Sequence, residues 1–163
     1  MSDPHPYHRP NVGVVLFNAE GRVWLGKGLQ FPGPWNPRVT QGGLVFCAQL
    51  RLRAPLPPPA RRELEEETGA RSTEYLGRTD GWIVYDFPDE VLARGGKWRG
   101  QKQVWFAFRF TGDEAEFRLD GHHQVEFEDW RWARLDEAPE LIVPFKRAAY
   151  EQVAQAFRPY AGP

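Results

Sequence analysis

The feature that most constrains the fold is a strongly helical segment, Ala60–Gly69, in a chain that otherwise favours strands, loops and one further helix at its end. Most of its residues are good helix formers. Pro59 stands where prolines favour the start of a helix, and Gly69 stands where a left-handed glycine ends one. A helix is therefore predicted here, and the rest of the fold must supply the surface on which it packs.

Short runs rich in aromatic and β-branched residues surround this helix and predict strands. The first two, Asn11–Phe17 and Arg22–Gly26, are joined by the turn signal Asn18–Gly21 and form a predicted hairpin. The further strands are predicted at Tyr75–Leu76, Trp82–Phe87, Val104–Phe110 and Val125–Trp132.

The remaining segments are an arm, a long loop and a final helix. Met1–Pro10 has little that could pack, and the prolines and glycines between Gly28 and Pro59 predict a loop. A helix is predicted from Pro144, with one face formed by Phe145, Ala148, Ala149, Gln152, Val153, Ala156 and Phe157. This order of elements predicts one domain over residues 1–163, of the α+β class, built as an α/β/α sandwich.

Composition narrows the classes of function. The net charge of −1 excludes a globally basic nucleic-acid binder, although the segment from Gly21 to Arg62, both included, contains seven Lys or Arg and no acidic residue. Cys47 is the only cysteine, which excludes an internal disulfide and a thiolate metal site. With no leader and no long apolar run, we expect a cytoplasmic protein that does not span a membrane.

The predicted helix carries three glutamates on one face. Glu63, Glu66 and Glu67 are three or four residues apart, so their side chains are neighbours on a helix and repel by about 0.2–0.5 kcal/mol per pair. A divalent cation would remove this repulsion, and Mg²⁺ and Mn²⁺ prefer oxygen ligands. Leu64 points away and is expected to anchor the helix on the core. The alternative is a solvated acidic first turn that the helix dipole favours.

The segment Arg62–Ala70, R-E-L-E-E-E-T-G-A, resembles the second half of the Nudix box, R-E-U-x-E-E-x-G-U, where U is apolar. Four further stretches resemble the bacterial RNA pyrophosphohydrolases of that family, also described as dinucleoside polyphosphate hydrolases. They are Arg9–Gly13, Gly100–Phe106, Glu126–Trp132 and Val143–Arg147. The matches occur in the family's order over nearly the whole chain and imply a Nudix fold, with a central mixed sheet between helices.

The resemblance also implies the roles of the catalytic carboxylates. Glu63, Glu66 and Glu67 would hold metal ions, Mg²⁺ or alternatively Mn²⁺, that bridge the phosphates of the substrate. Glu63 matches the position that activates the attacking water, and Glu126 matches a later glutamate that serves as metal ligand or base. Arg62 would orient the glutamates by ion pairing. A carboxylate that accepts a proton from metal-bound water is suited to phosphoanhydride hydrolysis.

The resemblance places six residues at the substrate: Arg9, Gln41, Gly42, Val143, Phe145 and Lys146. Arg9 matches an arginine near the triphosphate, and Phe145 matches an aromatic residue that stacks on a base. The alternative for Phe145 is a core position at the start of the final helix. Residues 101–103 either contact phosphates or are solvated at a strand entrance, and Trp130 and Trp132 are expected to pack.

The first half of the box is interrupted. Gly42 lies too far from Arg62 for the family's spacing. Ala54 stands where the family has a glutamate, and no Asp or Glu between Gly43 and Arg62 replaces it. Residues 37–59 are therefore an atypical segment, which is either an insertion or a short out-of-frame stretch. Poor order is expected there.

The predicted function is metal-dependent hydrolysis of 5′-triphosphorylated RNA, as in mRNA decay, or of dinucleoside polyphosphates. One alternative is a Nudix hydrolase acting on another nucleoside diphosphate derivative. Another is a non-catalytic module that binds a nucleotide or an RNA end, and the interrupted box favours this reading.

Overall fold

The computed structural model describes residues 4–28, 42–43, 45–47, 64–65, 68–118, 127–142 and 144–162. The strands are β1 (His8–Phe17), β2 (Val23–Gly28), β3 (Gly42–Gly43), β4 (Val45–Cys47), β5 (Thr73–Arg78), β6 (Ile83–Asp86), β7 (Gly100–Phe110) and β8 (Phe127–Ala133). The helices and short 3-10 turns are α2 (Asp89–Leu92), η1 (Glu114–Glu116), η2 (Leu135–Glu137), α3 (Ala138–Leu141), η3 (Pro144–Lys146), α4 (Arg147–Phe157) and η4 (Arg158–Tyr160). None of the helices within these ranges is long and apolar enough to cross a membrane.

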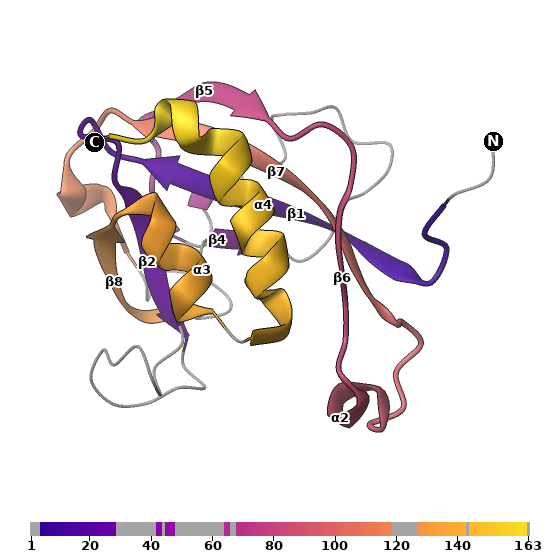
Figure 1. The fold of residues 1–163 in the computed structure, drawn as a ribbon. Coiled ribbons are helices and arrows are strands. Elements are labelled where there is room, and N and C mark those ends of the chain that lie inside the picture. Colours follow the sequence, from indigo (N-terminus) through magenta and orange to yellow (C-terminus); the bar gives the residue numbers. More distant parts are fainter. Residues whose placement is uncertain are drawn as a thin grey trace.

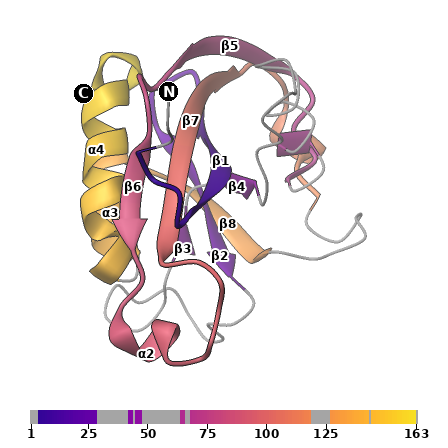
Figure 2. The ribbon, with the colours of Figure 1, turned by 90° about the vertical axis from the view of Figure 1, so that its right-hand side faces the viewer.

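The described strands form one mixed sheet of eight strands (Figures 1 and 2). Its main path is β3-β2-β1-β7-β5, while β4 pairs with β1, β6 with β7 and β8 with β2. The central pair, β1 and β7, is parallel, and the other pairs are antiparallel. The predicted mixed sheet and α+β class are confirmed.

The first hairpin forms as predicted. The side-chain oxygen of Asn18 accepts hydrogen bonds from the backbone N–H groups of Glu20 and Arg22, and Gly21 adopts a positive φ of 79°. The expectation of an arm up to Pro10 is wrong from His8 onward, because residues 8–10 pair with the start of β7 in the parallel register that holds the whole of β1.

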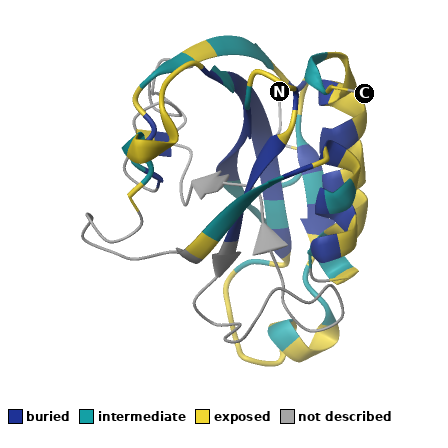
Figure 3. Cartoon of the chain, turned by 90° about the vertical axis from the view of Figure 1, so that its left-hand side faces the viewer, coloured by how far each residue is buried: buried dark blue, intermediate teal, exposed yellow. Residues whose placement is uncertain are grey.

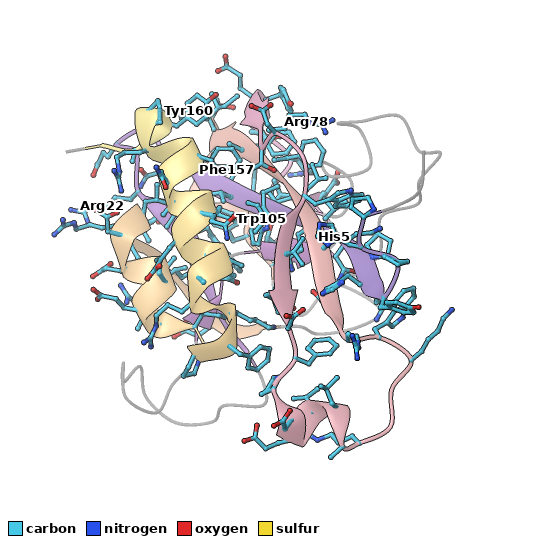
Figure 4. The ribbon with its side chains drawn as sticks, turned by 45° about the vertical axis from the view of Figure 1, so that its right-hand side comes forward. His5, Arg22, Arg78, Trp105, Phe157 and Tyr160 are labelled. Carbon is cyan, nitrogen blue, oxygen red and sulfur yellow. The ribbon has the colours of Figure 1, made fainter. Side chains whose placement is uncertain are left out.

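Two apolar layers cover the two faces of the sheet (Figure 3). On one face α4 packs over Val15, Phe17 and Trp105, and Figure 4 shows Trp105 and Phe157 between the helix and the sheet. A Cβ at Gly13 would lie 2.3 Å from the Trp105 ring, so glycine is needed for this packing. The opposite face is covered by a second layer, formed by Val12, Val14, Leu16, Trp24, Leu64, Ala70, Val104, Phe106, Phe108 and Phe110.

Two short strands lie inside the segment that was predicted to be loop. β3 pairs with the end of β2, and β4 pairs with Val12–Val14 of β1. The apolar β4 sequence is suited to a strand, and pairing with a central strand outweighs the prolines elsewhere in the segment. The rest of the atypical segment 37–59, and the expectation of poor order there, lie outside the described residues.

The final helix has a different buried face from the predicted one. Ala149, Val153 and Phe157 are buried as expected, but Ala148, Gln152 and Ala156 are exposed. Tyr150 and Ala154 are buried in their place. The physical reason is that the ring of Tyr150 packs on Trp105, with centroids 5.6 Å apart, while alanine fits either face of a helix.

Trp130 and Trp132 of β8 pack on the second apolar layer, as predicted.

Candidate active site

The helix predicted over Ala60–Gly69, which carries the three glutamates, is the carboxylate helix. Its described part confirms the predicted end and the predicted buried face. Leu64, Glu65 and Thr68 are helical, Leu64 is fully buried and Glu65 is exposed. Gly69 has a φ of +85° and donates its backbone N–H to the Glu65 carbonyl, so it ends the helix as predicted. Leu64 thus anchors the helix on the sheet, whereas the predicted site residues Glu63, Glu66 and Glu67 lie outside the described residues.

The last turn of this helix is joined to the segment that follows η1. The backbone N–H of Arg118 donates a 2.8 Å hydrogen bond to the Thr68 carbonyl. A Cβ at Gly69 would lie 2.3 Å from the carbonyl oxygen of Glu116, so glycine allows the two segments to approach closely. The helix end therefore has one fixed position relative to residues 116–118.

Glu116 holds this junction from the other side. Its carboxylate accepts hydrogen bonds from the backbone N–H groups of Arg71 and Ser72 and from the Ser72 hydroxyl, which is 2.6 Å away. The Ser72 hydrogen bond is the largest cause that lowers the pKa of Glu116. Sequence reasoning missed Glu116, because an acidic residue in a short polar segment gives no signal of the strand start that it contacts.

Glu126, the predicted later carboxylate, also lies outside the described residues. Its neighbour Phe127 begins β8, and Trp132 of the same strand donates its indole N–H to Glu114 of η1 over 2.6 Å. The η1 turn, with the two residues after it, therefore contacts the helix end, the residues just before β5, and β8, which lie next to the predicted catalytic glutamates.

Arg9 lies at the start of the central strands. It pairs with Gln101 of β7, and Gln101 pairs with Tyr85 of β6. Residues at odd positions of β1 and β7, such as Val15 and Trp105, belong to the layer beneath α4. Because side chains alternate along strands, Arg9 and Gln101 face that same side.

Lys102 and Gln103 are buried, so the alternative of solvated side chains at the strand entrance is wrong for these two residues.

Phe145 lies against this side, at the start of the final helix. It is half-buried and packs on the layer beneath α4, with its ring 5.9 Å from that of Tyr85 and 6.4 Å from that of Phe87. It thus has core contacts and an accessible part at once. The structure brings Phe145 to the same end of the sheet as Arg9, through Tyr85, while Val143 lies outside the described residues.

Lys146 follows Phe145 and lies close to two aromatic rings. Its Nζ is 5.8 Å from the ring centre of Phe145 and 5.9 Å from that of Tyr85. Burial lowers the pKa of Lys146, and it raises the pKa of the Tyr85 hydroxyl. That hydroxyl is buried without a hydrogen-bond partner among the described residues. Sequence reasoning missed Tyr85, although its alternation with Phe87 in one strand was a visible signal.

Gly42 lies at the far end of β2. It pairs with Lys27, which in turn pairs with Asp129 of β8. β2 therefore lies between the predicted Gly42 position and β8, the strand that follows Glu126. Gln41 lies outside the described residues.

The donor set predicted for a metal consists of carboxylates. The described ranges contain no group of three His, Cys, Asp or Glu side chains that could hold a metal ion. The predicted set of four glutamates offers only oxygen ligands, which suit hard divalent cations. By the chemistry of its donors, this set of glutamates fits Mg²⁺ or Mn²⁺. Glu65, which is next to the predicted glutamate face in the sequence, is exposed to solvent.

Comparison with known proteins identifies the family. The NUDIX domain matches residues 7–153, and the chain therefore belongs to the Nudix family, whose hydrolases are in general dependent on divalent metal ions. Among its relatives, the RNA pyrophosphohydrolase of Caulobacter vibrioides is 56% identical over 162 residues, covering 96% of this chain and 90% of that protein. The RNA pyrophosphohydrolase of Rhodospirillum rubrum is 44% identical over 160 residues, covering 97% and 91%. The predicted resemblance is confirmed.

Solved structures show the same fold at low sequence identity. The Escherichia coli dihydroneopterin triphosphate pyrophosphohydrolase has a TM-score of 0.61 at 16% identity, covering 92% of this chain and 98% of that one. A Caenorhabditis elegans Ap4A hydrolase has a TM-score of 0.60 at 11% identity, covering 93% and 98%. These likenesses confirm the Nudix fold.

Proposed function

We propose that this chain hydrolyses pyrophosphate from 5′-triphosphorylated RNA, with dinucleoside polyphosphates as a second class of substrate. The observation that carries the proposal is the 56% identity, over nearly the whole chain, to a protein named RNA pyrophosphohydrolase. The arrangement of Arg9 and Phe145 at one end of the sheet supports it, because a cation and an aromatic ring suit a phosphate next to a base. A role in mRNA decay in the cytoplasm is part of this proposal.

The reaction breaks the anhydride bond between the 5′ phosphate of the RNA and the departing pyrophosphate. A water molecule adds to phosphorus, and Glu63 or Glu126 accepts its proton. Glu63, Glu66, Glu67 and Glu126 would hold Mg²⁺ or Mn²⁺, which would supply neutralisation of the phosphate oxygens and a lower pKa of water. The described anchor of Leu64 and the junction at Thr68 would keep these glutamates in position.

At the other end of the substrate, Phe145 would stack on a base, with Val143 beside it. Burial lowers the pKa of Lys146, and a nearby phosphate would favour its charged form. Arg9 would contact the triphosphate, and Gln41 and Gly42 would line the path beside the end of β2.

The interrupted box supports a second candidate, a module that binds an RNA end without cleaving it. Ala54 stands where the family has a glutamate, and that absent carboxylate would brace the metal-binding helix. The two candidates share a binding site and differ only in turnover.

Product release with Mg²⁺ separates the candidates. Triphosphorylated RNA, diadenosine tetraphosphate and ADP-ribose are offered in parallel to the chain and to a version whose residues 37–59 are replaced by a family-like Gly-Gly-x-x-x-Gly-Glu loop. We expect pyrophosphate from the RNA, faster in the repaired version. Faster cleavage of ADP-ribose would favour the alternative hydrolase, which acts on another nucleoside diphosphate derivative. RNA binding without release by either version would establish the non-catalytic module.

A further inference from the structure

Next to Arg9 and Phe145, the sheet continues outward by one more row of residues. Arg9, Gln101 and Tyr85 are neighbours across three strands and form the inner row. Two residues further out, the Phe87 N–H donates to the Arg99 carbonyl and the Arg99 N–H donates to the Tyr7 carbonyl, both over 2.8 Å. Tyr7, Arg99 and Phe87 therefore form an outer row beside the inner one.

The outer row faces the same side as the inner row. Phe87 and Arg99 lie one residue outside β6 and β7 and continue the pairing of these strands, so Phe87 shares a face with Tyr85 and Arg99 with Gln101. Tyr7 lies in the turn just before β1, and its ring is placed beside Arg99 by the contact with the guanidinium, 5.9 Å from the ring centre. The ring contacts agree with this, since the Phe87 ring lies 6.0 Å from Tyr85 and 6.4 Å from Phe145. Both rows thus lie on the side of α4, and the outer row extends the surface away from Phe145.

The chemistry of the outer row is unusual for a protein surface. Tyr7 is the most exposed large apolar side chain of the described residues, at 61%. The Arg99 guanidinium lies 5.9 Å from the centre of the Tyr7 ring, and both side chains are exposed. In the same loop, the Lys97 ammonium lies 4.7 Å from the Trp98 ring. Tyr7 is exposed, while Trp98 and Phe87 are half-buried. Accessible aromatic rings beside cations are what proteins use to bind single-stranded nucleic acid.

The acidic residues nearby do not cancel the positive charge of the outer row. Asp86 belongs to the row of residues between the inner and outer rows, on the opposite face of the sheet, and its carboxylate lies 2.6 Å from the His8 imidazole. Asp89 and Glu90 are exposed on α2, and they set a limit to the basic surface on that side. Three strands about 4.8 Å apart make the outer row about 10 Å wide, enough for one or two bases.

We propose that the outer row, Tyr7, Arg99 and Phe87, binds nucleotides of a single-stranded RNA downstream of the 5′ end held at Phe145. The inference rests on the proposed function for the position of that 5′ end. The outer row would give RNA of several nucleotides an advantage in binding that a dinucleoside polyphosphate, which has no 3′-linked nucleotides, does not gain.

The test measures dissociation constants in EDTA, which prevents turnover, for 5′-triphosphorylated RNAs of about two and about eight nucleotides. The readout is the ratio of the two constants. We expect the chain to favour the longer RNA, and Tyr7→Ala and Arg99→Ala each to reduce that advantage about fivefold or more. Tyr7→Phe keeps the ring and should retain most of the advantage.

Arg158→Ala is the matched control, because Arg158 is an exposed arginine at the C-terminal end of α4, opposite the end where Phe145 lies. It should leave the ratio unchanged. An equal ratio in the unaltered chain and in Tyr7→Ala overturns the proposal, as does an equal effect of Arg158→Ala. Pyrophosphate release with Mg²⁺ is measured separately, so a length advantage without any release would reject the proposed hydrolysis and leave the outer row standing.

Discussion

The Arg118 N–H donates a 2.8 Å hydrogen bond to the Thr68 carbonyl and joins the last turn of the carboxylate helix to the η1 segment. The Glu116 carboxylate adds bonds to Arg71 and Ser72 at the start of β5. A short polar segment thus fixes the end of the helix from which the catalytic glutamates are expected to project.

Glu116→Ala is expected to lower Tm at neutral pH, because the N–H groups of Arg71 and Ser72 lose their acceptor. Glu116→Gln keeps an oxygen and should lower it less. The folded protein lowers the pKa of Glu116, so its stabilisation is present above the usual value of 4.5 and is lost as the pH falls through the lowered value. The Tm curves of the unaltered chain and Glu116→Gln should converge at acid pH. A gap that stays constant down to about pH 3 would contradict this assignment.

Replacing either Glu66 or Glu67 by Gln should weaken Mn²⁺ binding and turnover together, by at least about tenfold, because a ligand loses its charge. Glu65→Gln is the matched control, since Glu65 is exposed on the same helix. Calorimetric titration of Mn²⁺ and steady-state rates supply the measurements. If both variants bind Mn²⁺ and turn over as Glu65→Gln does, the helix is a solvated acidic turn.

Phe145→Ala should raise KM for RNA by about fivefold or more, because a stacked base loses its partner. Its half-burial against Tyr85 and Phe87 also predicts a moderate loss of stability, below about 2 kcal/mol. Phe157→Ala provides the comparison, since that ring is fully buried and its removal should cost about 3–5 kcal/mol. If Phe145→Ala loses as much stability as Phe157→Ala while KM is unchanged, Phe145 is a core residue and does not contact the substrate.

Much of the fold could be predicted from local pattern. The hairpin at Asn18–Gly21, the helix end at Gly69 and the buried Leu64 follow from turn chemistry, glycine conformation and helical spacing. Pairing between distant segments could not be predicted in this way. β4 is a strand because it reaches β1, and His8–Pro10 is a strand because β7 lies beside it.

The candidate site divides in the same way. Motif resemblance predicted substrate contacts for Arg9 and Phe145, which the structure brings to one end of the sheet. It could not predict that Tyr7 and Arg99 lie together, because their proximity depends on the register of β1 against β7. Glu116 likewise acts on residues more than forty positions away in the chain.

The interrupted box should limit activity. The family-like loop described above, with the usual spacing to Arg62 restored, is expected to raise turnover by about 10² or more, because small displacements of catalytic groups cost that much. The comparison needs steady-state rates at equal Mg²⁺ on the same RNA. Equal rates with and without the replacement would show that residues 37–59 are a tolerated insertion.

The most direct test is the amount of pyrophosphate released from 5′-triphosphorylated RNA, with Mg²⁺ or with EDTA, by the chain, its repaired version and the repaired version carrying Glu67→Gln. We predict slow Mg²⁺-dependent release by the chain, faster release by the repaired version, and a loss of that gain with Glu67→Gln. Release that persists in EDTA, or no release even from the repaired version, would contradict metal-dependent hydrolysis by this protein.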